Sequence, residues 1–338
     1  MLRTFQNVAQ ALRDCLVRDS DGRPVGWRRD LRDSPAEDTD GKAAERTGET
    51  GEPLDKATAA STAYGVRAML LLEDGLAADL IPVAESLRKM AVPAGGYAGR
   101  GQSKPRPEVT AAVLNALCRI DATDGFDDHR AEMERDLGDF EKFRPFILTI
   151  MLETSLLLRS GTKLVDTLVE SLLATRRPYG DLLLWPEKAE PSRVDPQPSV
   201  AHTARALRAL ASAQAVRPSS PVQKAIEQAA AWLIEQPDLH NAYEVNDRST
   251  KDRPDLVHVR HFTAAWVVKA LVSAGVPTEH PAVSHAVSRI WDSYGGGTVA
   301  LWAWDNGDLP IWMTFDAIEA LRLANLALPA QPAWSPAL

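Results

Sequence analysis

The chain has 338 residues, of which 45% are hydrophobic and 25% charged, and its formal net charge is −8. This composition is typical of a globular protein, and the acidic balance argues against a nucleic-acid partner, because such binding depends on Lys and Arg. The only two cysteines, Cys15 and Cys118, exclude a disulfide framework and a multi-thiolate zinc site.

The N-terminal stretch carries charges throughout and lacks the apolar segment of a secretory signal. The longest apolar run, "FILTIML" from Phe146, is far shorter than a membrane span. The sequence therefore predicts a cytoplasmic protein without a membrane-spanning segment.

Charged helical patterns alternate with alanine-rich ones along the chain. The charged patterns span Arg3–Val17, Ala77–Met90, Asp128–Phe140, Thr162–Thr175, Val222–Glu235 and Ala282–Asp292. The alanine-rich patterns share one phrase, in which Thr is followed six and seven positions later by Ala and a large apolar residue. The phrase starts at Thr62, Thr110, Thr203 and Thr314; a fifth copy fits if Ala264 takes the Thr position, and a degenerate sixth follows Phe146.

Loops that combine glycine with an aromatic residue join the two helices of a pair. Four of them read "DGRPVGW", "GGYAGRG", "RRPYGDLLLW" and "YGGGTVALWAW". Glycine permits the turn, and the aromatic side chain can wedge against neighbouring helices. Only "DLLLW" and "TVALWAW" are apolar runs that could form short strands.

Each helix pair has an apolar face that it cannot cover alone, so neighbouring pairs must stack. We expect an all-α fold, an α/α toroid in which six hairpins close into a double ring around a central cavity. An open solenoid is the competing architecture. The toroid would form one domain over residues 1–326, with a flexible acidic insertion or lid at 34–56, a polar insertion from Asn246 and a proline-rich tail at 327–338.

Several segments resemble those of a known superfamily. They are "GGYAGRGQSKPRPEVTAAVLNALCRI", "PSVAHTARALRAL" and "GDLPIWMTFDAIEALRL". They are similar to the repeats of protein prenyltransferase β subunits and squalene-cyclase-type terpene cyclases. The resemblance implies a double ring of helices whose ligands enter where the inner helices begin.

Residues at that location are the candidate binding residues. They are Tyr97, Arg100, His202, His258, Arg260, His261, Trp302, Trp304 and Trp312. The three tryptophans lie in or beside the last loop, where holding the last hairpin against the first is the favoured role; ligand contact can coexist with it. Acids that could act in catalysis, under an enzyme alternative only, are Asp305, Asp308 and Asp316.

The catalytic motifs of the superfamily are missing from this sequence. No DxDD is present, and the acids that follow Asp124 fit a solvated helix start better than a DDxxD magnesium site. The prenyltransferase zinc site is not carried over, because no Asp stands two residues before Cys118. His258 and His261 could share a metal if they were helical, but no third ligand is evident. We therefore predict no metal and no cofactor.

The favoured function is binding of an apolar small molecule, a peptide or a partner protein in the central cavity. The alternative is a terpene cyclase-like enzyme that acts on an apolar isoprenoid with a nonstandard acid. A purely structural subunit of a larger assembly is a third possibility.

Overall fold

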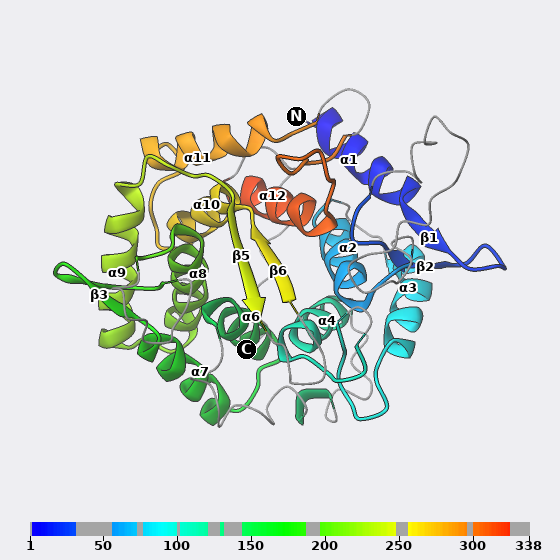
Figure 1. Cartoon of the computed structure of the whole chain (residues 1–338), viewed down its shortest axis with the longest axis horizontal. Coiled ribbons are helices and arrows are strands. Elements are labelled where there is room, and N and C mark those ends of the chain that lie inside the picture. Colours follow the sequence, from blue (N-terminus) through cyan, green and yellow to red (C-terminus); the bar gives the residue numbers. More distant parts are fainter. Residues whose placement is uncertain are drawn as a thin grey trace. The chain divides into compact units, whose positions relative to one another are not determined.

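The computed structural model describes residues 2–31, 56–72, 77–99, 102–120, 129–131, 144–186, 197–247, 256–295 and 300–324. Within these ranges the chain is mostly helical, and its strands form two-stranded antiparallel sheets (Figure 1). This confirms the predicted all-α class. The chain divides into two compact units, residues 1–129 with 293–338 and residues 130–292. That both belong to one domain over residues 1–326 stays a prediction.

The first unit combines the two ends of the chain. Its elements are α1 (Leu2–Asp14), β1 (Leu16–Arg18), β2 (Pro24–Trp27), α2 (Ala59–Leu72), α3 (Ala77–Lys89), α4 (Pro107–Arg119) and α12 (Ile311–Leu323). Helix α2 is central, since it contacts α1, α3, α4 and α12. Backbone hydrogen bonds join Leu31 to Leu309 and Ile311 to Arg29, so the segment after α1 is tied to the segment before α12.

The second unit is continuous in sequence. Its elements are α6 (Pro145–Leu157), α7 (Thr162–Ala174), β3 (Arg177–Tyr179), β4 (Leu182–Leu184), α8 (Val200–Val216), α9 (Ser220–Ile234), β5 (Ala242–Asp247), β6 (Leu256–His261), α10 (Thr263–Ser273) and α11 (Pro281–Asp292). Helix α8 packs between α6 and α10, while α7, α9 and α11 pack on these three helices.

Composition explains which helices are buried. In α4 every residue from Val109 to Leu117 is buried, as expected for a helix that is apolar or small on all sides. In α9 the buried residues form one stripe, Val222, Ala225, Ile226, Ala229 and Leu233, and the rest of the helix is more exposed. The alanine-rich helix α4 is thus buried on all sides and the charged helix α9 along one stripe, as predicted, whereas their arrangement in an inner and an outer ring stays a prediction.

The repeated Thr connects an inner helix to the aromatic loop that precedes it. Thr62 Oγ1 accepts a hydrogen bond from the backbone nitrogen of Trp27 at 3.2 Å. Thr110 Oγ1 accepts one from the backbone nitrogen of Tyr97 at 2.9 Å. These contacts give the phrase a structural reason, because they satisfy backbone donors of a loop that is buried against the helix.

The aromatic side chains act as the predicted wedges. The indole nitrogen of Trp27 donates to the carbonyl of Leu12 in α1 at 2.8 Å. The indole nitrogen of Trp185 makes the same 2.8 Å bond to Leu172 in α7. Both tryptophans are fully buried, so each spans from the outer helix towards the inner one.

Two predictions about local structure need correction. A polar insertion was expected from Asn246, but Asn246 and Asp247 are the last residues of β5, which pairs with β6 over six residues. The Thr position of that helix belongs to Thr263 rather than Ala264, because Thr263 Oγ1 accepts a hydrogen bond from the backbone nitrogen of Ala242 at 3.1 Å. Of the two possible strand runs, "DLLLW" contains β4, whereas "TVALWAW" contributes only an isolated bridge between Trp302 and Tyr294.

Three predicted segments lie outside the described residues. They are residues 34–55 of the acidic insertion, residues 132–140 of the third charged helix and the tail at 327–338.

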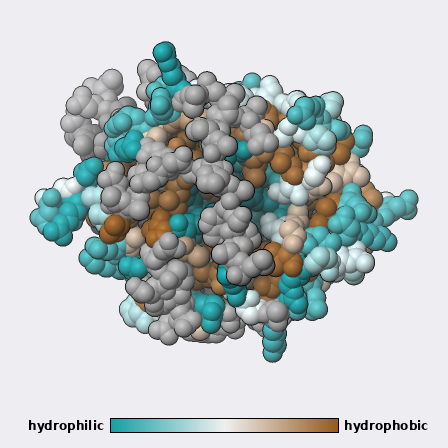
Figure 2. Space-filling view, turned by 180° about the vertical axis from the view of Figure 1, so that it is seen from behind, coloured by the Kyte–Doolittle hydropathy of each residue, from teal (hydrophilic) through white to brown (hydrophobic). Residues whose placement is uncertain are grey.

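Hydrophobic and hydrophilic residues are interspersed on the face of the molecule seen in Figure 2. Among the described residues, the large exposed apolar side chains are Ile81, Tyr179, Leu183, Val216 and Tyr243. No helix in the described ranges has the length and apolar character needed to cross a bilayer. The cytoplasmic location stays a prediction.

Candidate functional site

Two of the predicted binding residues meet in the second unit, at the N-terminal ends of the inner helices. His202 lies in the first turn of α8, and His261 is the last residue of β6, two positions before α10 begins. Both imidazoles are about 1% exposed, and their ring centroids are 4.9 Å apart. The sequence analysis placed candidate ligand contacts at this end of the inner helices.

Glu244 on β5 completes the cluster. In the β5–β6 register Ala242 lies opposite His261, so Glu244, two residues further along β5, shares the face of His261. His261 Nε2 lies 2.9 Å from Glu244 Oε1, within hydrogen-bond distance. His202 Nε2 lies 3.4 Å from the same oxygen without forming a hydrogen bond.

Neighbouring side chains orient the three groups. Arg144, at the N-cap of α6, donates from Nη1 to Glu244 Oε2 at 2.6 Å. Ser199, the N-cap of α8, lies with Oγ 3.0 Å from His202 Nδ1 and also accepts from the backbone nitrogen of His202. The cluster therefore joins the starts of α6, α8 and α10 through side chains rather than through packing alone.

Burial and mutual contact set the protonation states. Burial lowers the pKa of His261 to about 3, with further lowering by the Arg205 charge, although the hydrogen bond with Glu244 opposes this. Burial alone would raise the pKa of Glu244, but its contacts with His202 and His261 outweigh that effect and lower it. Both directions fit a neutral His261 imidazole that donates its Nε2 proton to an ionised Glu244 carboxylate.

Aromatic and cationic side chains surround the cluster. The ring of Phe146 lies edge-on to both imidazoles, with centroid distances of 6.5 Å to His202 and 6.3 Å to His261. The guanidinium of Arg205, one turn after His202, lies 3.9 Å from the ring centroid of Trp266. Among the described residues, three buried nitrogens of the cluster have no hydrogen-bond partner: His202 Nε2, His261 Nδ1 and Arg205 Nε.

The sequence analysis missed Glu244 and Arg144. Glu244 belongs to β5, a strand that the sequence analysis did not predict, and its partner depends on the β5–β6 register. Arg144 lies 100 residues before Glu244 in the chain, so no sequence spacing links the two. The available signal in the sequence is the stretch "AYEV", which fits a strand whose side chains alternate between two faces. In the structure Tyr243 is exposed and Glu244 is buried.

The other predicted residues do not join this cluster. Arg260 pairs with exposed Tyr243 on the opposite face of the β5–β6 hairpin. Arg100 and the side chain of His258 lie outside the described residues. Their binding roles stay predictions.

The remaining candidates belong to the first unit. Tyr97 and Trp302 are fully buried, and Trp304 packs on Trp312 with ring centroids 5.9 Å apart. Asp316 is buried in α12, whereas Asp305 is exposed on the preceding turn. Asp308, on the same turn, accepts a hydrogen bond from Asn306 Nδ2 at 3.0 Å. Roles in ligand contact or catalysis stay predictions for all of them.

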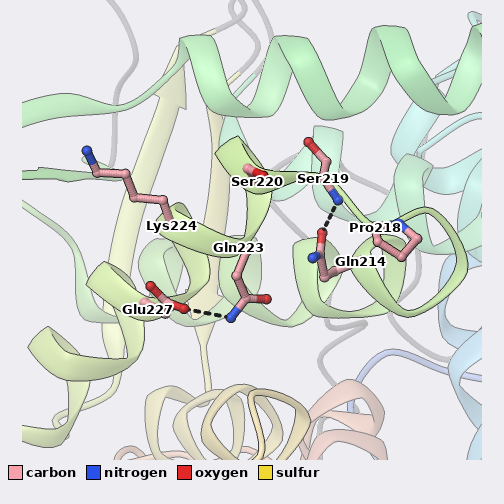
Figure 3. Close-up of a pocket in the computed structure, with 7 residues that line it drawn as sticks. All are labelled: Gln214, Pro218, Ser219, Ser220, Gln223, Lys224 and Glu227. Carbon is pink, nitrogen blue, oxygen red and sulfur yellow. Dashed lines mark hydrogen bonds between the residues drawn. The ribbon is translucent and has the colours of Figure 1, made fainter.

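A groove of about 590 Å³ lies elsewhere, at the turn between α8 and α9 (Figure 3). Four of its seven lining residues form two hydrogen-bonded pairs. Gln214 accepts from the backbone nitrogen of Ser219 at 2.8 Å, and Gln223 donates to Glu227 at 2.9 Å (Figure 3). Because no buried polar groups converge there, the His202–Glu244–His261 cluster is the better candidate site despite its low exposure.

No family model matches this sequence, and no curated protein matches it. Solved structures do match, each over 96% of this chain. A D-mannose isomerase is 10% identical, with 97% of its chain covered and a TM-score of 0.62. A family 76 glycoside hydrolase, a mannosidase of Bacteroides thetaiotaomicron, is 9% identical, with 97% covered and a TM-score of 0.57.

A type II terpene cyclase of Scytonema, in complex with geranylgeranyl dihydroxybenzoate, is 16% identical, with 98% of its chain covered and a TM-score of 0.55. Likeness at such low identity carries information on the fold and none on the reaction. The protein has the α/α-toroid fold of these enzymes.

Proposed function

We propose that the protein binds a small polar ligand at the starts of α6, α8 and α10, where His202, Glu244 and His261 cluster. The observation that carries the proposal is the set of buried polar atoms without a hydrogen-bond partner among the described residues. Such atoms are rare in folded proteins and cost about 1–3 kcal/mol each, so a ligand that satisfies them gains binding energy.

The chemistry of the cluster favours hydroxyl or carboxylate groups on the ligand. Arg144 and Arg205 supply positive charge, the two imidazoles can donate or accept, and Phe146 offers an apolar edge. A few placed polar groups beside aromatic walls are typical of small-molecule sites. Two structures of the same fold have mannose-related names, which makes a sugar a suitable first ligand to test. The missing DxDD argues against a protonation-initiated terpene cyclase.

A small polar ligand is a narrower proposal than the ligand classes that the sequence analysis left open. An isoprenoid would need a lining dominated by apolar side chains, whereas this cluster is dominated by ionisable ones. The carboxylates and amides of a peptide or a partner protein could use the same groups, so these occupants stay alternatives.

Ligand screening of the purified, tag-free protein tests the proposal. Monosaccharides, sugar acids and isoprenoid diphosphates are added singly, and thermal unfolding and calorimetry report binding. His202→Ala removes one imidazole of the cluster, and His240→Ala is the matched control, because the side chain of His240 is 81% exposed. We expect a polar ligand to stabilise the wild type and the control but not His202→Ala. Stabilisation by isoprenoid diphosphates alone, or equal stabilisation of all three proteins, contradicts the proposal.

A second candidate function is an enzyme that acts on an apolar isoprenoid through Asp316. One observation favours it: Asp316 is buried at 2% exposure, whereas Asp305 is exposed. Product formation from polyene substrates that is lost in Asp316→Asn and kept in Asp305→Asn would support this candidate.

A further inference from the structure

The three side chains of the cluster offer the donor set of a transition-metal site. His202, Glu244 and His261 each present one ligand atom, and these atoms all lie within 4.8 Å of one another. Two imidazole nitrogens and one carboxylate oxygen form a known ligand set for zinc that leaves the fourth position open. The sequence analysis considered His258 and His261 and found no third ligand; the fold instead brings His202 and Glu244 to His261.

The distances between the donor atoms suit the tetrahedral coordination of an ion. Zinc binds imidazole nitrogen and carboxylate oxygen at about 2.0–2.2 Å, which places tetrahedral donors about 3.3 Å apart. The oxygen Glu244 Oε1 lies 2.9 Å from Nε2 of His261 and 3.4 Å from Nε2 of His202. Both contacts come close to that spacing, and small rotations of the side chains would equalise them.

The surroundings supply, for His202 and Glu244, the outer contacts that metal ligands require. Histidine ligands are commonly held by a hydrogen bond at their second nitrogen, and ligating carboxylates are hydrogen-bonded in turn. Ser199 Oγ lies 3.0 Å from Nδ1 of His202, which leaves Nε2 to face Glu244. Arg144 binds the other oxygen of Glu244 at 2.6 Å, so Oε1 remains available.

One buried nitrogen of the cluster has no hydrogen-bond partner in the described part of the chain, and a bound ion would give it a partner. His202 Nε2 is buried and has no hydrogen-bond partner among the described residues, although it faces a carboxylate oxygen that His261 already uses. The nearby charge of Arg205 opposes a bound cation, but its guanidinium lies over the ring of Trp266, which attracts positive charge.

We infer that His202 Nε2, His261 Nε2 and Glu244 Oε1 bind a divalent first-row transition ion, with zinc as the expected occupant. The ion replaces the proton on Nε2 of His261, and the neutral imidazole then carries its proton on Nδ1. The inference rests on the proposed function only in placing the site at the same cluster. The ion would leave one coordination position open for an oxygen of the polar ligand.

Zinc binding is measured without any organic ligand, so the result is independent of the ligand screen. Tag-free protein is stripped with a chelator, dialysed, and titrated with Zn²⁺. We expect one ion per chain in the wild type and a loss of roughly 100-fold in affinity in His202→Ala, His261→Ala and Glu244→Gln. His240→Ala is the control, because His240 Nε2 lies 3.4 Å from Asp238 in a pair that is exposed.

A second measurement needs no variant. Co²⁺ in a tetrahedral site absorbs strongly in the visible, whereas octahedral Co²⁺ absorbs weakly. A strong visible band in the wild-type protein, displaced by one equivalent of Zn²⁺, supports the site. If the band is absent and no stoichiometric Zn²⁺ uptake is found, the inference is overturned and the cluster is a hydrogen-bonded triad. Zn²⁺ uptake that His240→Ala abolishes and the cluster variants retain also overturns the inference. A polar ligand that still binds the metal-free protein would keep the proposed function while the metal inference falls.

Discussion

Replacing Gly65 with alanine tests how tightly the aromatic wedge of the first repeat is packed. Gly65 lies in α2, where a Cβ atom would be 2.2 Å from Cε3 and 2.4 Å from Cδ2 of the Trp27 ring. Non-bonded carbon atoms sit about 3.5–4.0 Å apart, so the overlap exceeds an ångström. The ring has no room to retreat, because it is fully buried and its Nε1 is bonded to Leu12.

The expected magnitude comes from two opposing effects. Alanine in place of glycine stabilises a helix interior by about 1 kcal/mol. Overpacking a buried site costs about 1–3 kcal/mol, and overlap with a fixed ring points to the upper end. We expect Gly65→Ala to lower the free energy of unfolding by about 2 kcal/mol, which for a unit of this size lowers Tm by roughly 4–8 °C.

Circular dichroism during heating measures the change, and a double-mutant cycle identifies its cause. In a Trp27→Leu background the ring atoms are gone, so Gly65→Ala should become stabilising by about 1 kcal/mol. A higher Tm for Gly65→Ala in the wild-type background would refute the packing of Trp27 against α2.

Three further predictions concern the loop of the second repeat. Tyr97→Phe removes a buried hydroxyl that has no hydrogen-bond partner among the described residues. We expect urea unfolding to show a free energy of unfolding that is equal to that of the wild type or higher by up to about 1 kcal/mol. A clear loss of stability would indicate a partner for the hydroxyl. Burial raises the pKa of Tyr97 to about 12, against the opposing charge of Arg88. Because the folded state then keeps a proton that the unfolded state releases, stability should be retained below pH 10 and fall by about 2–3 kcal/mol as the pH rises to about 12, and Tyr97→Phe should lack this component. Thr110→Val removes the acceptor of the Tyr97 backbone N–H, and we expect a loss of about 1–3 kcal/mol in the same urea titration, with an unchanged midpoint as the contradicting result.

Helix identity and position were readable from the sequence because they depend on local patterns. The pattern predicted at Thr162–Thr175 forms α7 at Thr162–Ala174, and the one at Ala77–Met90 forms α3 at Ala77–Lys89. The first pattern, Arg3–Val17, ran too far, since Val17 belongs to β1. A β-branched residue such as Val17, just before a turn, can end a helix or belong to a strand. Its pairing with Gly26 in the structure shows that it belongs to a strand.

The candidate site was only half readable. His202 and His261 could be found because they stand where inner helices begin. Glu244 belongs to the site because of the register between β5 and β6. A shift of one residue would turn its side chain to the opposite face of the hairpin. Contacts between distant segments, such as that of Arg144 with Glu244, depend on the packing of α6 and α10 on either side of α8 and leave no trace in local spacing.

The discontinuous first unit has a consequence for how the chain is made. During synthesis residues 130–292 can fold as soon as they emerge, because they form a compact unit that is continuous in sequence. The first unit must wait for α12, whose residues leave the ribosome almost 200 positions after those of α4. Until then the side of α2 that packs on α12 stays uncovered, so a nascent or truncated chain without Ile311–Leu323 should depend on chaperones that the finished protein does not need.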